Sequence, residues 1–449
     1  MVASRVLSRR GFLRLVGATA SLGLIAACAQ APAAQPTPTT APTPTSPLAT
    51  VPTPTAAAPK PTEAPKPAAT AAPAATTAPA AKQAVPGVSE SEVLLGTWMP
   101  LTGPASAWGV VGRTYEAYFA MVNDRGGIHG RKVRVIVEDD SYSPAKTVPL
   151  VKKMVEQDRV FAFLGGLGTP SGTAVLDYIV QNRVPHIAPS TGASIWSEPP
   201  KPGYYAWQIN YKTEARILAR YGVETLKLKK YAIFYQNDDY GKEGLGEAKV
   251  QVPRRGGELV GEVAYNVTDT DYSAHALKLK ESGAEAVLTW PSVRQFASLL
   301  KETWKIGYKP VWLNSATVND PSLIRLAPEE VQGAYFVTYL PDPNDPANAD
   351  IPAIKEWREN LPKYNKDLPL SNFTLYGWGQ GRLMRELLNR AGRDLTREGL
   401  EKAAQSLKNW QDLATVTYSE TDRRGITVGW MSQAKGENTV KVSDPISSD

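Results

Sequence analysis

The chain has 449 residues, of which 42% are apolar, with one cysteine, three histidines and a formal net charge of +6. That charge comes entirely from the beginning of the chain, because residues 88–449 hold 43 basic and 43 acidic side chains. A neutral folded part has no general attraction for phosphate, which disfavours a nucleic-acid-binding function. The single cysteine excludes an internal disulfide and a cysteine-rich zinc site, and the three histidines lie too far apart in sequence for metal-ligand spacing. We therefore expect no metal and no cofactor.

Residues 1–28 have the features of an export signal. Arg9 and Arg10 resemble a twin-arginine motif, and the apolar stretch at 16–29 is shorter than a membrane-spanning helix requires. The Ile-Ala-Ala-Cys sequence ending at Cys28 resembles a bacterial lipobox. The alternative is a chance arginine pair and a buried cysteine. We expect export, cleavage before Cys28, and lipid on its thiol that holds the protein on the outer face of the cell membrane.

The segment from 29 to 87 contains 15 of the 37 prolines, mixed with alanine and threonine. It has almost no large apolar side chains and therefore cannot bury a core of its own. We expect an extended, disordered tether that acts as a passive spacer between the membrane and a folded body.

After the tether, short apolar segments alternate with segments of helical periodicity. The strand-like segments are 93–97, 132–138, 160–164, 186–188, 231–235, 258–265, 286–290 and 311–313. The helix-like segments between them are 107–123, 145–156, 171–181, 242–252, 273–281 and 294–304. This alternation is typical of parallel βαβ units and predicts two successive α/β lobes.

The last part of the chain breaks this alternation. Helical periodicity at 352–364, 376–390 and 397–405 is followed by strand-like segments at 415–418 and 425–431. Helices without strand partners must pack on an earlier lobe, so the chain must cross between the lobes more than once. We expect the N-terminal lobe at 88–211 plus about 340–410, the C-terminal lobe at 212–339 plus about 411–435, and a tail at 436–449.

Distinctive motifs occur at Met99–Gly109, Val122–Arg131, Asp139-Asp140, Phe163–Gly166 and Asp239–Lys242. They resemble motifs of the substrate-binding proteins of ABC transporters for branched-chain amino acids, the Leu/Ile/Val type, and the similarity covers about 90–435. The resemblance implies a type I periplasmic binding fold: two Rossmann-like parallel-sheet lobes joined by three crossovers, which close on a ligand by hinge motion.

Thr169 is the first candidate contact for a ligand, because it follows the strand that ends at Leu164. Small ligands of α/β lobes bind at the carboxyl ends of strands. The Thr169 hydroxyl and the N–H groups of Ser171 and Gly172 are suited to bind a carboxylate, and the resemblance also implies a carboxylate contact at Thr169. The alternative is an ordinary helix N-cap.

Ser190 and Thr191 follow the next short strand and match the family's second ligand loop. Gly192 stands where the resemblance implies serine or threonine, so one hydroxyl is lost there. Backbone contacts at Ser190 would survive that loss.

Aromatic residues are the next candidates for the ligand site. The resemblance places Trp108 over the ligand, and Tyr240 lies at the matching strand end of the second lobe. Trp290 and Ser292 follow the next strand, and Trp378 is a candidate for either the cleft or the core. For each aromatic residue, burial in the core is the alternative.

Ala316 occupies the position at which the resemblance implies a glutamate that pairs with the ligand's ammonium. A buried ammonium without a counter-charge costs roughly several kcal/mol. Either Asp238, Asp239 or Asp320 replaces that glutamate, or the ligand carries no ammonium. The second alternative favours amides, ureas, or aliphatic and aromatic carboxylates.

Enzymatic function is disfavoured by the motifs. The glycine-rich stretch at 163–170 lacks the G-x-G-x-x-G spacing, because Ser171 stands at the last glycine position, and no Walker lysine or G-x-S-x-G sequence is present. The resemblance, together with the expected lipobox, implies a monomeric, lipid-anchored solute-binding protein that delivers a small organic ligand to an ABC permease. A ligand-sensing receptor component of the same fold is the alternative.

Overall fold

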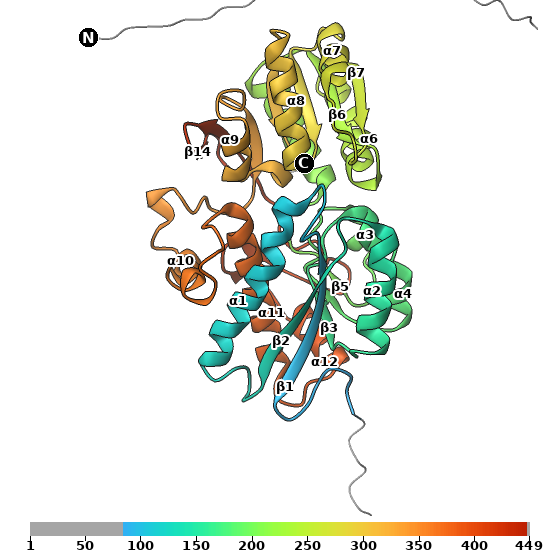
Figure 1. The fold of residues 1–449 in the computed structure, drawn as a ribbon, viewed down its shortest axis with the longest axis vertical. Coiled ribbons are helices and arrows are strands. Elements are labelled where there is room, and N and C mark those ends of the chain that lie inside the picture. The colour runs from blue at the N-terminus through green and yellow to red at the C-terminus, as the bar shows by residue number, and fades with distance from the viewer. Residues whose placement is uncertain (1–83, 447–449) are drawn as a thin grey trace, which may run out of the picture. The chain divides into compact units, whose positions relative to one another are not determined.

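The computed structural model describes residues 84–446, so the expected signal, Cys28 and nearly all of the tether lie outside the described residues. The first sheet has the strand order β2-β1-β3-β4-β5, and all of its neighbouring strands are parallel (Figure 1). Its strands are β1 (Glu92–Met99), β2 (Lys132–Asp139), β3 (Ala162–Leu164), β4 (His186–Ile187) and β5 (Tyr204–Tyr205).

The second sheet has the order β14-β13-β10-β9-β8-β6-β7 and is parallel except where β13 pairs with β10 and β14. Its strands are β6 (Lys230–Gln236), β7 (Glu258–Tyr265), β8 (Ala286–Trp290), β9 (Val311–Asn314), β10 (Tyr335–Thr338), β13 (Trp430–Lys435) and β14 (Asn438–Lys441). A separate hairpin consists of β11 (Trp410–Gln411) and β12 (Thr415–Val416).

Helices pack on the two sheets as two groups. The first lobe holds α1 (Val110–Asp124), α2 (Pro144–Glu156), α3 (Thr169–Thr173), α4 (Leu176–Gln181), α10 (Pro352–Tyr364), α11 (Asn372–Ala391) and α12 (Arg397–Gln405). The second lobe holds α5 (Tyr211–Arg220), α6 (Asp239–Arg254), α7 (Ser273–Glu281), α8 (Val293–Lys305) and α9 (Pro321–Leu326). Figure 1 shows α11, coloured orange, beside the blue α1, although the two are far apart in sequence.

Short helical turns lie at Ser106–Gly109, Ser194–Trp196, Tyr221–Thr225, Ala316–Val318 and Pro346–Asn348. The strands β1, β3 and β8 are apolar and buried, as expected of parallel strands with helices on both faces. In β1, for example, every residue after Glu92 is buried. The predicted fold class, two parallel-sheet α/β lobes, is confirmed.

The lobe boundaries near the end of the chain differ from the prediction. The segment after 411 hydrogen-bonds to the first lobe, because the Tyr418 hydroxyl donates to the Ala206 carbonyl at 2.6 Å and the Ile426 N–H donates to the Trp207 carbonyl at 2.9 Å. The polypeptide chain therefore passes from the first lobe to the second after Ile426, just before β13 begins at Trp430. The predicted tail at 436–449 is also wrong in part, because β14 pairs with β13.

The described residues also bear on membrane insertion and metal binding. Between residues 84 and 446, no helix combines the length and apolar composition needed to cross a membrane. The 20-residue helix α11, for example, carries Arg382, Arg385 and Arg390. Within the same range, no three His, Cys, Asp or Glu side chains gather as a set of metal ligands.

Two glycines turn the chain at the end of β3 toward α3. Gly165 and Gly166 have φ values of 73° and 80°, in the left-handed region that disfavours side chains. The loop also passes close to the core, because a Cβ on Gly166 would lie 2.6 Å from the Trp98 ring. These residues thus fix the approach of the chain to Thr169.

Gly166→Ala should therefore destabilise the fold more than Gly130→Ala does. Both positions have left-handed φ values, 80° and 79°, but a Cβ on Gly130 meets nothing within 4 Å. Backbone strain of about 1 kcal/mol affects both variants, and the ring contact adds roughly 1–3 kcal/mol at Gly166 alone. Chemical denaturation of the two variants measures the difference. Equal losses would contradict the proposed tight packing against Trp98.

Candidate functional site

Two adjoining cavities lie where the carboxyl ends of the strands of the two sheets face each other. The first cavity comprises about 400 Å³ of space, part of it open to solvent, and is lined by residues of both lobes. Its lining comprises Ala105, Trp108, Tyr142, Leu167, Gly168, Thr169, Ser190, Gln208, Tyr211, Tyr240, Pro291, Ser292 and Thr317. Most of these residues follow the ends of β1, β3, β4, β6, β8 and β9, where parallel α/β lobes bind small ligands.

The hydroxyl groups of the first lobe are held in place by neighbouring polar groups. The hydroxyls of Thr169 and Thr191 are hydrogen-bonded at 2.6 Å, and Thr191 lies 3.4 Å from the Tyr211 hydroxyl. The Ser190 hydroxyl donates to Oε1 of Gln380 at 3.3 Å. Thr169 and Ser190 are therefore presented to the cavity in fixed orientations.

Gln380 connects α11 to the ligand loops of the first lobe. Its Nε2 donates to the carbonyl of Ala188 at 2.8 Å and to the hydroxyl of Tyr376 at 3.0 Å. Its Oε1 accepts from the hydroxyl of Tyr115 as well as from Ser190. A helix from the end of the chain thus positions a loop that precedes it by almost two hundred residues.

The second lobe closes the first cavity with aromatic and hydroxyl groups. The Tyr240 hydroxyl donates to the Pro291 carbonyl at 3.1 Å and is hydrogen-bonded to the Thr317 hydroxyl at 2.5 Å. Across the lobes, Nε2 of Gln236 donates to the Tyr142 hydroxyl at 3.1 Å. The two lobes therefore meet through hydrogen bonds beside the cavity.

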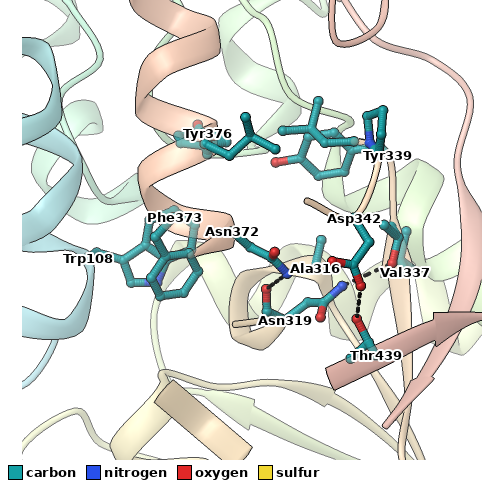
Figure 2. Close-up of a pocket in the computed structure, with 14 residues that line it drawn as sticks. Trp108, Ala316, Asn319, Val337, Tyr339, Asp342, Asn372, Phe373, Tyr376 and Thr439 are labelled. Carbon is teal, nitrogen blue, oxygen red and sulfur yellow. Dashed lines mark hydrogen bonds between the residues drawn. The ribbon is translucent and has the colours of Figure 1, made fainter. Parts of the chain in front are cut away.

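The second cavity adjoins the first at Trp108, which lines both, and it contains about 480 Å³ of empty space (Figure 2). Its lining comprises Trp108, Ala316, Asn319, Val337, Thr338, Tyr339, Leu340, Pro341, Asp342, Asn372, Phe373, Leu375, Tyr376 and Thr439. Trp108 stacks on Phe373 with ring centroids 3.9 Å apart, and Figure 2 shows this pair at one end and Asp342 with Thr439 at the other.

Charge is scarce in both cavities. Among the described residues that line the first cavity, none carries a formal charge, and among those that line the second, only Asp342 does. Burial raises the pKa of Asp342, and the hydrogen bond from the Asn344 N–H opposes that rise. Thr439 donates to Oδ2 of Asp342 at 3.3 Å.

Glu214 is a fully buried acid directly behind Ala316. Its Oε2 accepts from the Ser315 hydroxyl at 2.5 Å and its Oε1 accepts from the Ala316 N–H at 3.3 Å. Burial raises the pKa of Glu214 to about 8, although the hydrogen bonds from Ser315 and Ala316 lower it. The carboxyl is therefore largely protonated at neutral pH and does not belong to the lining of either cavity.

Sequence reasoning missed Glu214 because it missed α5. The available signal was a helix start at Asn210, whose side chain accepts from the Thr213 N–H at 2.7 Å. Tyr142, Gln208 and Tyr211 were missed as well. They follow predicted or observed strands but were not singled out, since tyrosine and glutamine in loops carry no distinctive pattern.

Six of the predicted ligand-binding residues line the cavities. Trp108, Thr169, Ser190, Tyr240 and Ser292 line the first cavity, and Ala316 lines the second, which Trp108 also borders. These positions come from both lobes, as the resemblance implied. Their contact with a ligand stays a prediction.

Four predicted residues lie behind the cavity walls instead. Thr191 supports Thr169, and the Ser171 hydroxyl donates to Oδ2 of Asp140 at 2.8 Å. Trp290 is fully buried, and Trp378 is buried with its Nε1 donating to Glu356. The N–H of Gly172 donates to the Gly168 carbonyl at 2.9 Å, so it is not free for a carboxylate.

The three acids considered as replacements for the missing glutamate have other partners. Asp238 accepts from the N–H of Tyr240 at 3.0 Å and caps α6, and Asp320 caps α9 and accepts from the N–H of Phe373 at 3.1 Å. Asp239 accepts from the Thr173 hydroxyl at 3.4 Å. Among the described lining residues of the two cavities, none of these three occurs.

Two α/β lobes whose strand ends face each other across two adjoining cavities, with Asp342 as the single charged residue among the described lining residues, define a two-lobed ligand-binding protein. The chain belongs to the periplasmic binding protein family, whose sequence profile matches residues 92–439. The predicted resemblance to the Leu/Ile/Val-binding type is confirmed by its relatives, and the family's members act outside the cytoplasm.

Similar proteins include Leu/Ile/Val-binding protein homolog 3 of Brucella melitensis, 27% identical over 74% of this chain and 88% of that protein. An amino acid binding protein of Pseudomonas aeruginosa is 24% identical over 75% of this chain and 87% of its own length.

Among solved structures, a fatty acid ABC transporter substrate-binding protein from Thermomonospora curvata is 25% identical with a TM-score of 0.73, covering 81% of this chain and 95% of that one. A branched-chain amino acid ABC transporter protein from Thermus thermophilus with bound valine has a TM-score of 0.72 and 21% identity, covering 80% and 96%.

Glu214→Gln should flatten the dependence of stability on pH. From about pH 4.5 to about pH 8 the folded carboxyl keeps its proton while the unfolded one loses it, so the free energy of unfolding falls as pH rises. The wild type should lose up to roughly 1.4 kcal/mol per pH unit there relative to the variant.

Urea unfolding at pH 5 and pH 8.5 tests this expectation. Glu329→Gln removes an exposed glutamate and serves as the matched control, so its curves should follow those of the wild type. Parallel curves for Glu214→Gln and the wild type would contradict the assignment of a buried, protonated carboxyl.

Proposed function

We propose that this chain is an extracytoplasmic solute-binding protein that captures a small organic ligand between its lobes and delivers it to the permease of an ABC importer. The observation that carries the proposal is that residues of both lobes line the same cavity. A ligand bound there touches both lobes and so stabilises their closed arrangement.

In this proposal, Thr169 and Ser190 of the first lobe bind the polar end of the ligand. Tyr240 and Ser292 approach it from the second lobe, and the Trp108 ring packs over it. Two hydrogen bonds join the lobes here, from Gln236 to Tyr142 and from the Phe373 N–H to Asp320, and they would stabilise the closed arrangement. The permease would recognise the surface created by that closure.

The ligand belongs to the range of branched-chain amino acids and related amides, ureas and carboxylates. The relatives named above support this range, since one is named for Leu, Ile and Val, one structure holds valine and another is named for fatty acids. We also propose that the protein is monomeric, has no enzymatic activity and uses no cofactor.

The lipid anchor on Cys28 completes the proposal, with the proline-rich segment at 29–87 as its spacer. A lipid anchor would keep the binding protein near its permease after export. These residues lie almost entirely outside the described part of the chain.

Thr169→Val should weaken ligand binding without unfolding the first lobe, because valine keeps the shape of threonine and loses its hydroxyl. The full-length protein is screened by thermal unfolding against branched-chain amino acids and their matched amides and carboxylates. A ligand at about 100 times its dissociation constant stabilises by roughly 2.7 kcal/mol. For the compound that binds, the variant should lose about tenfold in affinity.

Thr303→Val makes the same chemical change at a buried position of α8, where the hydroxyl donates to the Leu300 carbonyl at 2.9 Å. That control should bind as the wild type does. An unchanged affinity in Thr169→Val would remove Thr169 from the site.

Cys28→Ser should release the protein from the membrane. The thiol is the only acceptor for lipid in the expected lipobox, and several chains with about 0.8 kcal/mol per buried CH₂ hold an anchored protein firmly. Fractionation of expressing cells and labelling with a clickable fatty acid measure the change. A variant that stays in the membrane fraction with its label would contradict the anchor.

A further inference from the structure

The first cavity lacks a charged partner for an ammonium group. Among its described lining residues none is charged, and several of its carbonyl and amide oxygens already accept a hydrogen bond. The Pro291 carbonyl accepts from Tyr240 at 3.1 Å, Oε1 of Gln208 accepts from Tyr376 at 2.6 Å, and the Leu167 carbonyl accepts from Trp98 at 3.2 Å. An ammonium buried there would lose water without gaining a counter-charge.

The same cavity is well supplied with hydroxyl groups. Thr169, Ser190 and Ser292 contribute hydroxyls from both lobes. Ser190 and Ser292 donate to glutamine oxygens at 3.3 and 3.2 Å, and Thr169 is hydrogen-bonded to Thr191, so a ligand oxygen that accepts from them replaces these bonds. Donors of this kind suit the oxygen atoms of a carboxylate or an amide, because hydrogen bonds to a carboxylate favour its charged form.

The nearest acids are committed to other groups. Both oxygens of Glu214 accept hydrogen bonds, from the Ser315 hydroxyl at 2.5 Å and the Ala316 N–H at 3.3 Å, and its side chain is fully buried behind Ala316. Asp342 lies at the far end of the second cavity and accepts from the Asn344 N–H at 2.8 Å and from Thr439 at 3.3 Å.

The second cavity offers an apolar continuation from Trp108. The indole lines both cavities and stacks on Phe373, and Figure 2 shows Tyr376 and Tyr339 beyond this pair, with Ala316 and Val337 nearer Asp342. Ala316 leaves room there because its side chain is a single methyl group. The hydrocarbon chain of a ligand that passes Trp108 therefore leaves water and contacts aromatic and aliphatic side chains.

We propose that the ligand is an acyl compound, a carboxylic acid or its amide, with an apolar chain and no free amino group. The ligand's acyl group lies in the first cavity against Thr169, Ser190 and Ser292. Its apolar hydrocarbon chain extends past the Trp108 ring into the second cavity. This inference rests on the proposed function, because it names the ligand class of that same site.

Isothermal titration of the full-length protein with L-leucine, 4-methylpentanoate and 4-methylpentanamide tests the absence of the ammonium. The three compounds share one carbon skeleton. We expect the acid or the amide to bind at least about tenfold more tightly than leucine, and the better of the two identifies the acyl group. Leucine binding as tightly as the better of the two would overturn the inference.

Titration with butanoate, hexanoate and octanoate, or with their amides, tests the apolar continuation. Each added methylene that enters the second cavity should tighten binding roughly fourfold. Ala316→Leu fills that cavity and should weaken the octanoyl compound about tenfold while leaving the butanoyl compound unchanged. Affinity independent of chain length, or equal losses for both compounds, would overturn the path through the second cavity.

The midpoint of thermal unfolding of Ala316→Leu without ligand shows whether this variant is folded. If that midpoint falls below the wild-type value, Ala316→Val, which adds a smaller side chain, is used instead of Ala316→Leu. Asp342→Asn tests for a hidden counter-charge at the far end of the second cavity. Loss of binding of an amino compound in that variant would overturn the inference and place an ammonium at Asp342.

These outcomes separate the inference from the proposed function. Stabilisation by leucine but by no acyl compound defeats the inference and leaves the solute-binding function intact. If no acyl compound and no member of the wider screen of amino acids, amides and carboxylates binds, both the inference and the proposed ligand range fail.

Discussion

Parallel strand pairing is the constraint on which the candidate site depends. In a parallel sheet, all strands end at the same edge, so parallel pairing alone brings the loops that follow them together. The register of β1 on β2, from Glu92 beside Lys132 to Met99 beside Asp139, sets where the loops after both strands emerge. The same rule in the second lobe brings Tyr240, Ser292 and Thr317 together, although β6, β8 and β9 are separated in sequence.

Loops that gather at an edge are still free to move, and here the returning helix α11 limits that freedom. Gln380 bonds to the Ala188 carbonyl and to Ser190, while Phe373 of the same helix supports Trp108 from behind. The backbone N–H of Phe373 also donates a hydrogen bond to Asp320 of the second lobe. One helix therefore holds loops of its own lobe that border the first cavity and also contacts the other lobe.

The strand and helix pattern was largely predictable from the sequence, because buried strands and amphipathic helices leave a clear periodicity; 258–265 and 273–281 are examples. Strand β10 was missed because its four residues are too few to show a clear period, and helix α5 was missed although its ten residues follow a capping residue, Asn210. The sequence correctly predicted that residues in loops after strands, such as Thr169 and Ser292, line the cavity. Trp290 and Trp378 were also candidates, but the structure buries both away from the cavity lining. The direction in which a large aromatic side chain points is set by packing that a single sequence does not display.

The equal numbers of acids and bases in residues 88–449 have a kinetic consequence. A neutral body around a first cavity whose described lining carries no charge exerts no long-range force on a ligand. For the proposed function, encounter with the ligand would then be governed by diffusion, and the association rate should hardly change with ionic strength. Ligand capture would be equally effective at low and at high salt concentration.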